Sequence, residues 1–232
     1  MGLTSATAVL ERMDAAPRHI FITGGTGYLG RELIPQLLCR GHRVRALVRP
    51  GSGSSLPRGC GVIRGNALDG STFAGKISPA DTFVQLVGVP HPSPAKAKQF
   101  REVDLVSVRE SVYAAKAAGV AHFIYLSVAQ PAPVMREYLA VRAEGEALIR
   151  AAGFNATFIR PFYVLGPGHW WPHLILPLFW LAEILPAWRA AARRLKPVTL
   201  AQTIHLLVQA VEHPGRGVRI VDAEAMRNLR LD

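Results

Sequence analysis

The chain has 232 residues, of which 50% are hydrophobic and 19% charged, so it is long and apolar enough to fold around one sizeable core. A formal net charge of +11 indicates an anionic partner: a nucleotide phosphate, an anionic membrane surface or a nucleic acid. Two cysteines, Cys39 and Cys60, exclude a disulfide framework, and no group of His, Asp and Cys has the spacing of a metal site.

The first residues, "MGLTSATAVLERMDAAPRH", have neither a basic start nor a sustained apolar core, which argues against a secretory signal. We expect residues 1–17 to form a flexible tail or a short helix and residues 18–232 to form a single domain. With few cysteines and no leader, the expected location is the cytoplasm, with membrane association as an alternative.

Short apolar runs alternate with helical patterns along the rest of the chain. Strands are expected at 19–23, 44–48, 62–63, 82–87, 122–127, 156–160 and 218–222. Helices are expected at about 28–40, 97–118, 137–152 and 199–212, and three of them end at Gly41, Gly119 and Gly153. This alternation predicts an α/β fold with a doubly wound parallel sheet, the Rossmann fold, whose apolar strands are covered on both faces.

The stretch "FITGGTGYLGRELI" (21–34) places glycines between the first strand and the first helix. Gly24 would allow the tight turn, Gly27 would let the backbone approach a pyrophosphate, and Gly30 would let the helix pack closely on the strand. The start of the helix then offers free N–H groups and a partial positive charge to phosphates. The alternative is a glycine-rich turn without a ligand.

"TGGTGYLG", followed by "RPFYVLGPG" at 160–168, resembles the short-chain dehydrogenase/reductase superfamily. The resemblance, over roughly residues 18–222, is to its atypical branch: NmrA-like and epimerase/dehydratase-like NAD(P)-binding proteins, similar to an accessory subunit of respiratory complex I. It implies an NAD(P)-binding domain. The loop residues expected to contact the dinucleotide are Gly24, Thr26, Gly27, Tyr28, Leu29 and Gly30.

The choice of dinucleotide depends on the end of the second strand. NAD sites place an acidic residue there for the ribose hydroxyls, and NADP sites place an Arg for the 2′-phosphate. Between Glu32 and Asp69 the chain has no Asp or Glu, and Arg49 occupies this position. We therefore expect NADP(H) to be preferred over NAD(H), with Arg49 bonding the phosphate. Arg45 and Arg58 are interpreted as solvated surface charges, which is also the alternative for Arg49.

Three further segments correspond, through the resemblance, to parts of the family's site. The loop "GNALD" is expected beside the adenine, with Asn in place of the usual Asp; "QLVGVP" lines the adenosine ribose; and "RPFY" lies along the nicotinamide. Alternatives are core packing for Leu86 and Val87, and packing under a lid for the aromatic pair. The residues expected to contact the dinucleotide are Asn66, Ala67, Leu86, Val87, Gly88, Pro161, Phe162 and Tyr163.

The superfamily's catalytic residues are a Ser and a Tyr-x-x-x-Lys pair on a helix. The resemblance places Ser127 at the end of the fifth strand as the orienting hydroxyl and Tyr138 as the proton donor. Arg142, on the same helix face as Tyr138, stands where Lys is expected and would bond the nicotinamide ribose. The alternatives are a capping Ser, a Tyr with its hydroxyl in water, and a surface Arg.

The segment at 168–197, "GHWWPHLILPLFWLAEILPAWRAAARRLKP", interrupts the strand–helix rhythm. Its apolar part is broken by prolines and is too short for a membrane-spanning helix. A basic run follows: Arg189, Arg193, Arg194 and Lys196. We interpret the segment as a lid or pocket wall, with contact to a partner or to a membrane interface as alternatives.

Two functions fit this sequence. One is an NADP(H)-dependent oxidoreductase or isomerase acting on a small, apolar carbonyl or hydroxy compound. The alternative is a non-catalytic protein that holds NADP(H) as a structural or redox-sensing element and presents the segment at 168–197 to a partner or membrane. Nucleic-acid binding is a weaker third option, because the positive charge is spread along the chain and no recognition motif occurs.

Overall fold

The computed structural model describes residues 16–51, 56–132, 135–167 and 184–228, together with Phe179 and Ala182. A seven-stranded sheet has the order β3-β2-β1-β4-β5-β6-β9, and every neighbouring pair is parallel. The order reverses between β1 and β4, so the predicted doubly wound sheet is confirmed. Its strands are β1 (His19–Thr23), β2 (Arg43–Val48), β3 (Gly61–Arg64), β4 (Thr82–Gln85), β5 (His122–Leu126), β6 (Asn155–Arg160) and β9 (Val218–Asp222).

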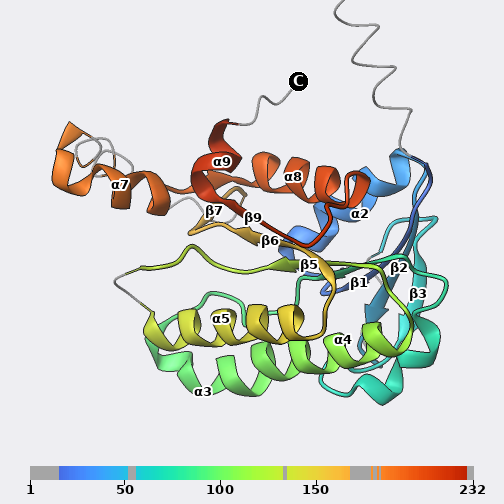
Figure 1. The fold of residues 1–232 in the computed structure, drawn as a ribbon. Helices are drawn as coiled ribbons and strands as arrows, with labels where there is room; N and C mark the ends of the chain where they lie inside the picture. Colours follow the sequence, from blue (N-terminus) through green and yellow to red (C-terminus); the bar gives the residue numbers. More distant parts are fainter. Residues whose placement is uncertain are drawn as a thin grey trace, which may run out of the picture.

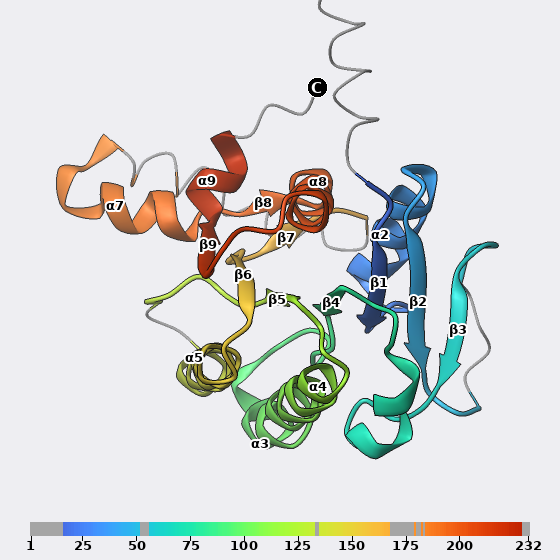
Figure 2. The same cartoon turned by 45° about the vertical axis from the view of Figure 1, so that its right-hand side comes forward.

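Helices cover both faces of the sheet (Figure 1). On one face lie α2 (Tyr28–Cys39), α8 (Leu200–Glu212) and α9 (Ala223–Asn228). The other face carries α4 (Val106–Ala117) and α5 (Arg136–Ala151), as the turned view in Figure 2 also shows. The short helix α3 (Ala97–Gln99) and the π-helical segment η4 (Phe100–Leu105) lead into α4. Single turns of 3₁₀ helix occur at η1 (Gly70–Thr72), η2 (Ala74–Lys76) and η3 (Pro94–Lys96).

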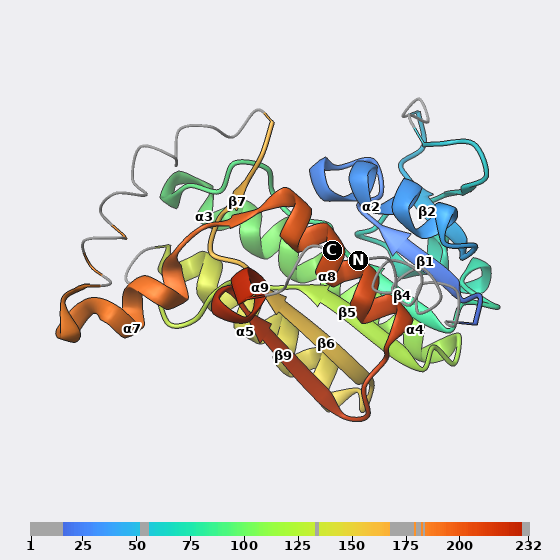
Figure 3. The same cartoon turned by 90° about the horizontal axis from the view of Figure 1, so that it is seen from above.

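A second, two-stranded parallel sheet joins β7 (Val164–Leu165) to β8 (Val198–Thr199). Between them in the chain, α7 (Pro186–Leu195) packs against α9 and extends beyond the main sheet, as Figures 1 and 3 show. Within the described ranges, no helix has the length and apolar character needed to cross a bilayer. The tail expected at residues 1–17 falls almost wholly outside these ranges, as does most of the apolar part of the expected lid.

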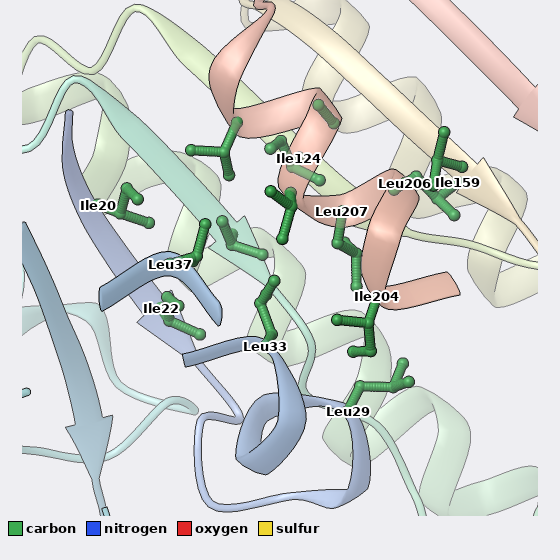
Figure 4. Packing of buried hydrophobic residues seen from close by; sticks show 14 of the residues in the cluster. Ile20, Ile22, Leu29, Leu33, Leu37, Ile124, Ile159, Ile204, Leu206 and Leu207 are labelled. Carbon is green, nitrogen blue, oxygen red and sulfur yellow. The ribbon is translucent and has the colours of Figure 1, made fainter. Parts of the chain in front are cut away.

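The core consists of two apolar layers, one on each face of the sheet. Figure 4 shows the first, in which side chains of α2 and α8 meet those of the strands, including Leu33, Ile204 and Ile22. The second layer is rich in phenylalanine, and the Phe83 ring stacks on Phe123 with centroids 5.1 Å apart. Burial on both faces explains why these strands are apolar at consecutive positions.

Buried polar groups gather at the amino ends of the strands. His122 is 2% exposed and its Nε2 lies 3.0 Å from the Thr157 hydroxyl. His42 is 3% exposed, with its Nε2 3.4 Å from a carboxylate oxygen of Glu212. Asp81 accepts a hydrogen bond from the backbone N–H of His19 at 3.0 Å. This edge of the sheet is closed by contacts within the fold.

Candidate functional site

The carboxyl ends of β1 and β4 are neighbours, and the order of the sheet reverses between them. In an open parallel sheet this is where ligands bind. The chain leaves β1 at Thr23, passes through the glycine loop and enters α2 at Tyr28. Every segment predicted to contact the dinucleotide lies at or just after the carboxyl end of a strand, or, for Tyr28 to Gly30, in the first turn of α2. The topology therefore brings these segments to one edge.

The glycines of the loop are required by close contacts. Gly24 has φ +77°, and a Cβ there would lie 2.8 Å from the backbone carbon of Leu86 at the end of β4. A Cβ at Gly30 would lie 2.6 Å from the carbonyl oxygen of Gly24, so α2 packs tightly on the loop. Gly25 was not singled out in the sequence, and a Cβ there would lie 2.9 Å from the Cβ of Ala46. Gly27 is exposed, and a Cβ there would lie 3.1 Å from the Gly24 carbonyl oxygen.

The start of α2 suits a phosphate group. Gly27 is its N-cap, no side chain caps the helix, and no acidic residue occupies its first turn. The first N–H groups therefore face neither a capping oxygen nor a carboxylate, which leaves their partial positive charge for an anion. Arg31 adds a cation, because its Nε donates to the Thr26 carbonyl oxygen at 2.8 Å. The N–H groups and this guanidinium are donors that fit a pyrophosphate. Leu29, also predicted to contact the dinucleotide, is buried.

Tyr28 connects the glycine loop to the segment after β6. A Cβ at Gly166 would overlap the Tyr28 hydroxyl, so glycine is required there. Burial raises the pKa of Tyr28, and Glu32 and Tyr163 raise it further. Pro161 is buried and its carbonyl accepts the Ala129 N–H at 3.0 Å, while the Tyr163 carbonyl accepts the Val198 N–H at 2.9 Å. These bonds hold the segment beside the site, with Phe162 and Tyr163 partly buried.

The arginines around the end of β2 differ in their surroundings. Arg49 is exposed, and within the described residues no hydrogen bond or ion pair engages its guanidinium. Arg64 ends the neighbouring β3 and is also exposed. Arg58 is exposed as well, as expected. Arg45 was expected to be solvated, and this is wrong: it is half-buried and its Nη2 donates to the Ile77 carbonyl at 2.8 Å.

The other predicted contact residues lie on either side of the loop. Asn66 is exposed after β3, and its Oδ1 accepts the Leu68 N–H at 3.0 Å, which leaves its amide NH₂ for a ligand. Ala67 is half-buried and packs against the phenylalanine layer. Leu86 packs against the opposite layer, and Val87 follows it as the chain turns past Gly24.

Arg142 forms a buried ion pair with Asp104. Its Nη2 lies 2.6 Å from Asp104 Oδ1, and the side chains are 4% and 0% exposed. Nη1 donates to the Leu126 carbonyl at 2.9 Å and lies 3.4 Å from the Tyr125 hydroxyl. A Cβ at Gly88 would lie 2.5 Å from Nη2. The alternative of a surface Arg is therefore wrong, and Gly88 is required by the guanidinium beside it.

Electrostatics keep Arg142 charged in this environment. Burial lowers its pKa, but Tyr138, Tyr125 and Asp104 raise it by more, so the net shift is upward. Burial also raises the pKa of Asp104, although Arg142 opposes the shift. Burial raises the pKa of the Tyr125 hydroxyl to about 12, so this group stays neutral. Arg142 is therefore a fixed cation at the carboxyl end of β5, where it bonds the Leu126 carbonyl.

Tyr138 stacks on this cation. Its ring centroid lies 5.0 Å from Arg142 Cζ, and it also contacts the Phe100 ring, with 5.0 Å between the centroids. The side chain is half-buried. Within the described residues, no hydrogen bond links its hydroxyl to Ser127. Tyr138 and Arg142 therefore contact each other without a bond from Tyr138 to Ser127 within the described residues.

Ser127 belongs to a separate buried cluster. It is 3% exposed, and its hydroxyl donates to Glu146 Oε1 at 2.6 Å. The same oxygen accepts a bond from Arg160 Nε at 2.8 Å. Glu146 is 3% exposed, so this carboxylate is neutralised by the arginine that precedes Pro161. The hydroxyl proton of Ser127 therefore points into the fold.

Asp104 and Glu146 were missed in the sequence. Asp104 lies four residues before Val108 and so on the buried stripe of its helix, where a carboxylate needs a partner. Glu146 follows Arg142 by one helical turn. For Asp104, the position of a charged residue in a predicted apolar stripe could have indicated a buried partner. No metal-binding group of His, Cys, Asp and Glu occurs in the described part of the chain.

The sequence profile of the NAD(P)H-binding family matches residues 24–167, from the first glycine of the loop to the segment after β7. The chain belongs to the NAD(P)H-binding family. The NAD(P)-binding domain that the resemblance implied is therefore confirmed, and the relatives of the chain include reductases and a dehydrogenase/isomerase.

Among relatives of this NAD(P)H-binding protein, the ceramide reductase of Caulobacter vibrioides is 29% identical over 198 residues, covering 83% of this chain and 57% of the relative. The divinyl chlorophyllide a 8-vinyl-reductase of Oryza sativa subsp. indica is 29% identical, covering 68% of this chain and 42% of the relative. The chain thus spans about half the length of these relatives.

The fold is similar to that of the Bordetella bronchiseptica enzyme WbmH, whose structure was solved in complex with NAD⁺. The TM-score is 0.65 with 19% sequence identity, covering 88% of this chain and 75% of that one. At this identity the likeness concerns the fold, which both proteins share.

Proposed function

We propose that the chain is an NADP(H)-dependent oxidoreductase that acts on an apolar carbonyl or hydroxy compound, with Tyr138 as the proton donor. The observation that carries the proposal is the stacking of the Tyr138 ring on the buried Arg142 cation, 5.0 Å away. The buried guanidinium holds the Tyr138 ring in place through this contact. A tyrosine held in this way can donate its proton to a substrate oxygen.

The preference for NADP(H) is supported by the end of β2. The exposed Arg49 guanidinium is free of partners within the described residues, and Arg64 lies on the neighbouring strand. An Arg here can bond a 2′-phosphate through two parallel hydrogen bonds, whereas no acidic residue is present for ribose hydroxyls. We assign the adenine to Asn66 and Ala67, and the adenosine ribose to Leu86 and Val87.

A bound nicotinamide ring would supply or accept the hydride. The first N–H groups of α2 would hold the pyrophosphate, and Phe162 and Tyr163 would line the nicotinamide ring. Arg142 places its positive charge beside Tyr138 and bonds Asp104 and the Leu126 carbonyl, and we keep the proposal that it also bonds the nicotinamide ribose. Ser127 donates to Glu146 and so offers a substrate only its lone pairs.

The relatives support an apolar substrate. One is named for ceramide, a lipid, and another for divinyl chlorophyllide, and both are reductases. We propose that the substrate of this chain shares this apolar character and that the reaction is a reduction.

Calorimetric titration tests the dinucleotide. NADPH is expected to bind more tightly than NADH, and Arg49→Gln should weaken NADPH binding by about tenfold or more, as expected for the loss of a charge-assisted bond, with little effect on NADH. Arg58→Gln removes an exposed Arg from the same loop and should change neither affinity. Tighter binding of NADH to the natural protein would overturn the preference.

Consumption of NADPH with a panel of aldehydes, ketones and quinones tests turnover. Tyr138→Phe should abolish turnover while the affinity for NADPH stays within about twofold, because the ring and its stacking on Arg142 remain. Tyr113→Phe, at an exposed tyrosine of α4, is the matched control and should keep full activity. Equal activity of the two variants would remove Tyr138 from its role.

A non-catalytic dinucleotide-binding protein is the second candidate. It is favoured by the engagement of Ser127 with Glu146 and of Arg142 with Asp104, because both groups are turned to partners within the fold. Tight binding of NADPH without consumption by any member of the panel would select this function.

A further inference from the structure

Large apolar side chains are exposed at the start of α7 and in the two residues before it. Ile184, Leu185 and Trp188 are 70%, 49% and 64% exposed, and we call them the α7 tip. At the other end of the helix, Ala192 and Leu195 are 4% and 8% exposed. A tryptophan and two aliphatic side chains exposed together are uncommon on a protein surface that contacts only water.

The apolar stripe of α7 continues past the body of the protein. Within α7, Trp188, Ala192 and Leu195 follow the helical spacing of four and three residues, so they share one face; Ile184 and Leu185 directly precede the helix. The inner half of this face is buried in the fold, while the outer half extends beyond it, as α7 does in Figures 1, 2 and 3. Burying the tip against another apolar phase would therefore complete the stripe.

Basic residues are frequent in α7 and in the elements next to it. In residues 184–196 and in α9, the positive side chains outnumber a single carboxylate, Glu224, which lies 3.7 Å from Arg193. Arg194 is anchored to the body, since its Nε donates to the Pro131 carbonyl at 3.0 Å. The cations of this region are Arg189, Arg193, Arg194, Lys196 and Arg227.

We propose that the α7 tip docks on an anionic lipid bilayer, with Trp188 at the level of the headgroups and the exposed arginines of α7, Arg189 and Arg193, near lipid phosphates. Tryptophan favours the membrane interface, and each basic residue near an anionic surface strengthens binding. A second copy of the chain is a poorer partner, because a symmetric contact would bring two sets of the same cations together. The proposal is independent of the proposed function, since lipid binding requires no turnover.

Vesicle flotation tests the proposal. The full chain should float with vesicles of phosphatidylcholine and phosphatidylserine, stay behind with phosphatidylcholine alone, and detach at high salt. Arg189→Gln should weaken binding about fivefold, the effect of one basic residue near the surface, and Trp188→Ala should weaken it further. Thermal unfolding of Trp188→Ala should be unchanged, because this side chain is 64% exposed.

Matched controls lie on the opposite face of the sheet. Tyr113→Ala and Arg109→Gln alter an exposed aromatic residue and an exposed arginine of α4 and should leave flotation unchanged. Flotation that is equal on both vesicle types, absent, or insensitive to Trp188→Ala would overturn the proposal. So would a concentration-dependent dimer, measured by ultracentrifugation, that Trp188→Ala disrupts, because the tip would then bind a second copy.

Discussion

Arg142 Nη2 lies 2.6 Å from Asp104 Oδ1, and the pair joins α5 to the π-helical segment before α4. Both side chains are buried and have lost their contact with water, so each charge is stabilised mainly by the opposite charge. A π-helical turn within a helix often marks a functional site. Here it contains the carboxylate that fixes the guanidinium under Tyr138.

Breaking this pair from one side should destabilise the protein strongly. Asp104→Ala is expected to lower the free energy of unfolding by about 3–5 kcal/mol, because it leaves the Arg142 charge buried and unpaired. Urea denaturation measures the change. Asp104→Leu combined with Arg142→Met removes both charges and should recover much of the loss.

The exposed pair Lys98–Glu102, 3.5 Å apart, provides the control. Lys98→Ala should change the free energy of unfolding by less than about 1 kcal/mol, as is usual for a solvated ion pair. A loss for Asp104→Ala no larger than that for Lys98→Ala would show that the buried pair contributes nothing.

The glycine loop should tolerate no side chain at Gly30. In Gly30→Ala the new Cβ would meet the carbonyl oxygens of Gly24 and Gly25 at 2.6 and 2.5 Å, so loop and helix must separate. We expect a loss of about 1–3 kcal/mol in stability and weaker NADPH binding. Gly75→Ala, where nothing lies within 4 Å, should leave both unchanged, and calorimetry with urea unfolding distinguishes the two variants. Unaltered binding in Gly30→Ala would mean that the loop is not the phosphate site.

Stability should fall on acidification because of His122. Burial, assisted by Arg18 and Arg219, lowers its pKa from 6.5 to about 4. Above pH 6.5 the ring is neutral in both states. Between pH 6.5 and 4 only the unfolded chain takes up the proton, so the folded state loses stability, by roughly 3 kcal/mol in all.

His122→Gln should flatten this part of the pH profile of the free energy of unfolding. His213→Gln, at an exposed histidine, should leave the slope as it is. If the slope between pH 6.5 and 4 is the same in His122→Gln as in the natural protein, the loss arises from other groups.

The two thiols should react at different rates. Burial raises the pKa of Cys60 to about 11 from 9.0, so at neutral pH it carries roughly a hundredfold less thiolate than an ordinary cysteine. Cys39 is exposed. Mass spectrometry after brief treatment with iodoacetamide should find Cys39 modified first, and faster modification of Cys60 would contradict its burial.

Local pattern was sufficient to predict the main elements. All seven strands of the main sheet occur within two residues of their expected bounds. Short, continuous apolar runs are typical of strands that are buried on both faces of a sheet. Gly41, Gly119 and Gly153 have φ of +79°, +72° and +76°, as helix-ending glycines require. The short helix α9 was missed, although Asp222, whose Oδ1 accepts the Ala225 N–H at 2.8 Å, marks its start.

Pairing between distant residues was harder to predict. Arg142 meets Asp104 across 38 positions, and Ser127 meets Glu146 across 19, in both cases through the packing of α5 on its neighbours. A motif states which residue types stand at which spacing, but the direction of a side chain depends on such partners. The Ser and the Tyr–Arg pair therefore fell into separate clusters although their positions in the chain match one motif.

The two ends of the sheet have separate duties. His42, His122 and Asp81 hold the amino rim together through contacts within the fold, whereas the groups assigned to ligands occupy the opposite rim. A substitution at one end of the strands is separated from the residues at the other end by the length of a strand. Substitutions at the amino ends of the strands could therefore raise stability to heat or acid, while substitutions at the carboxyl ends change specificity.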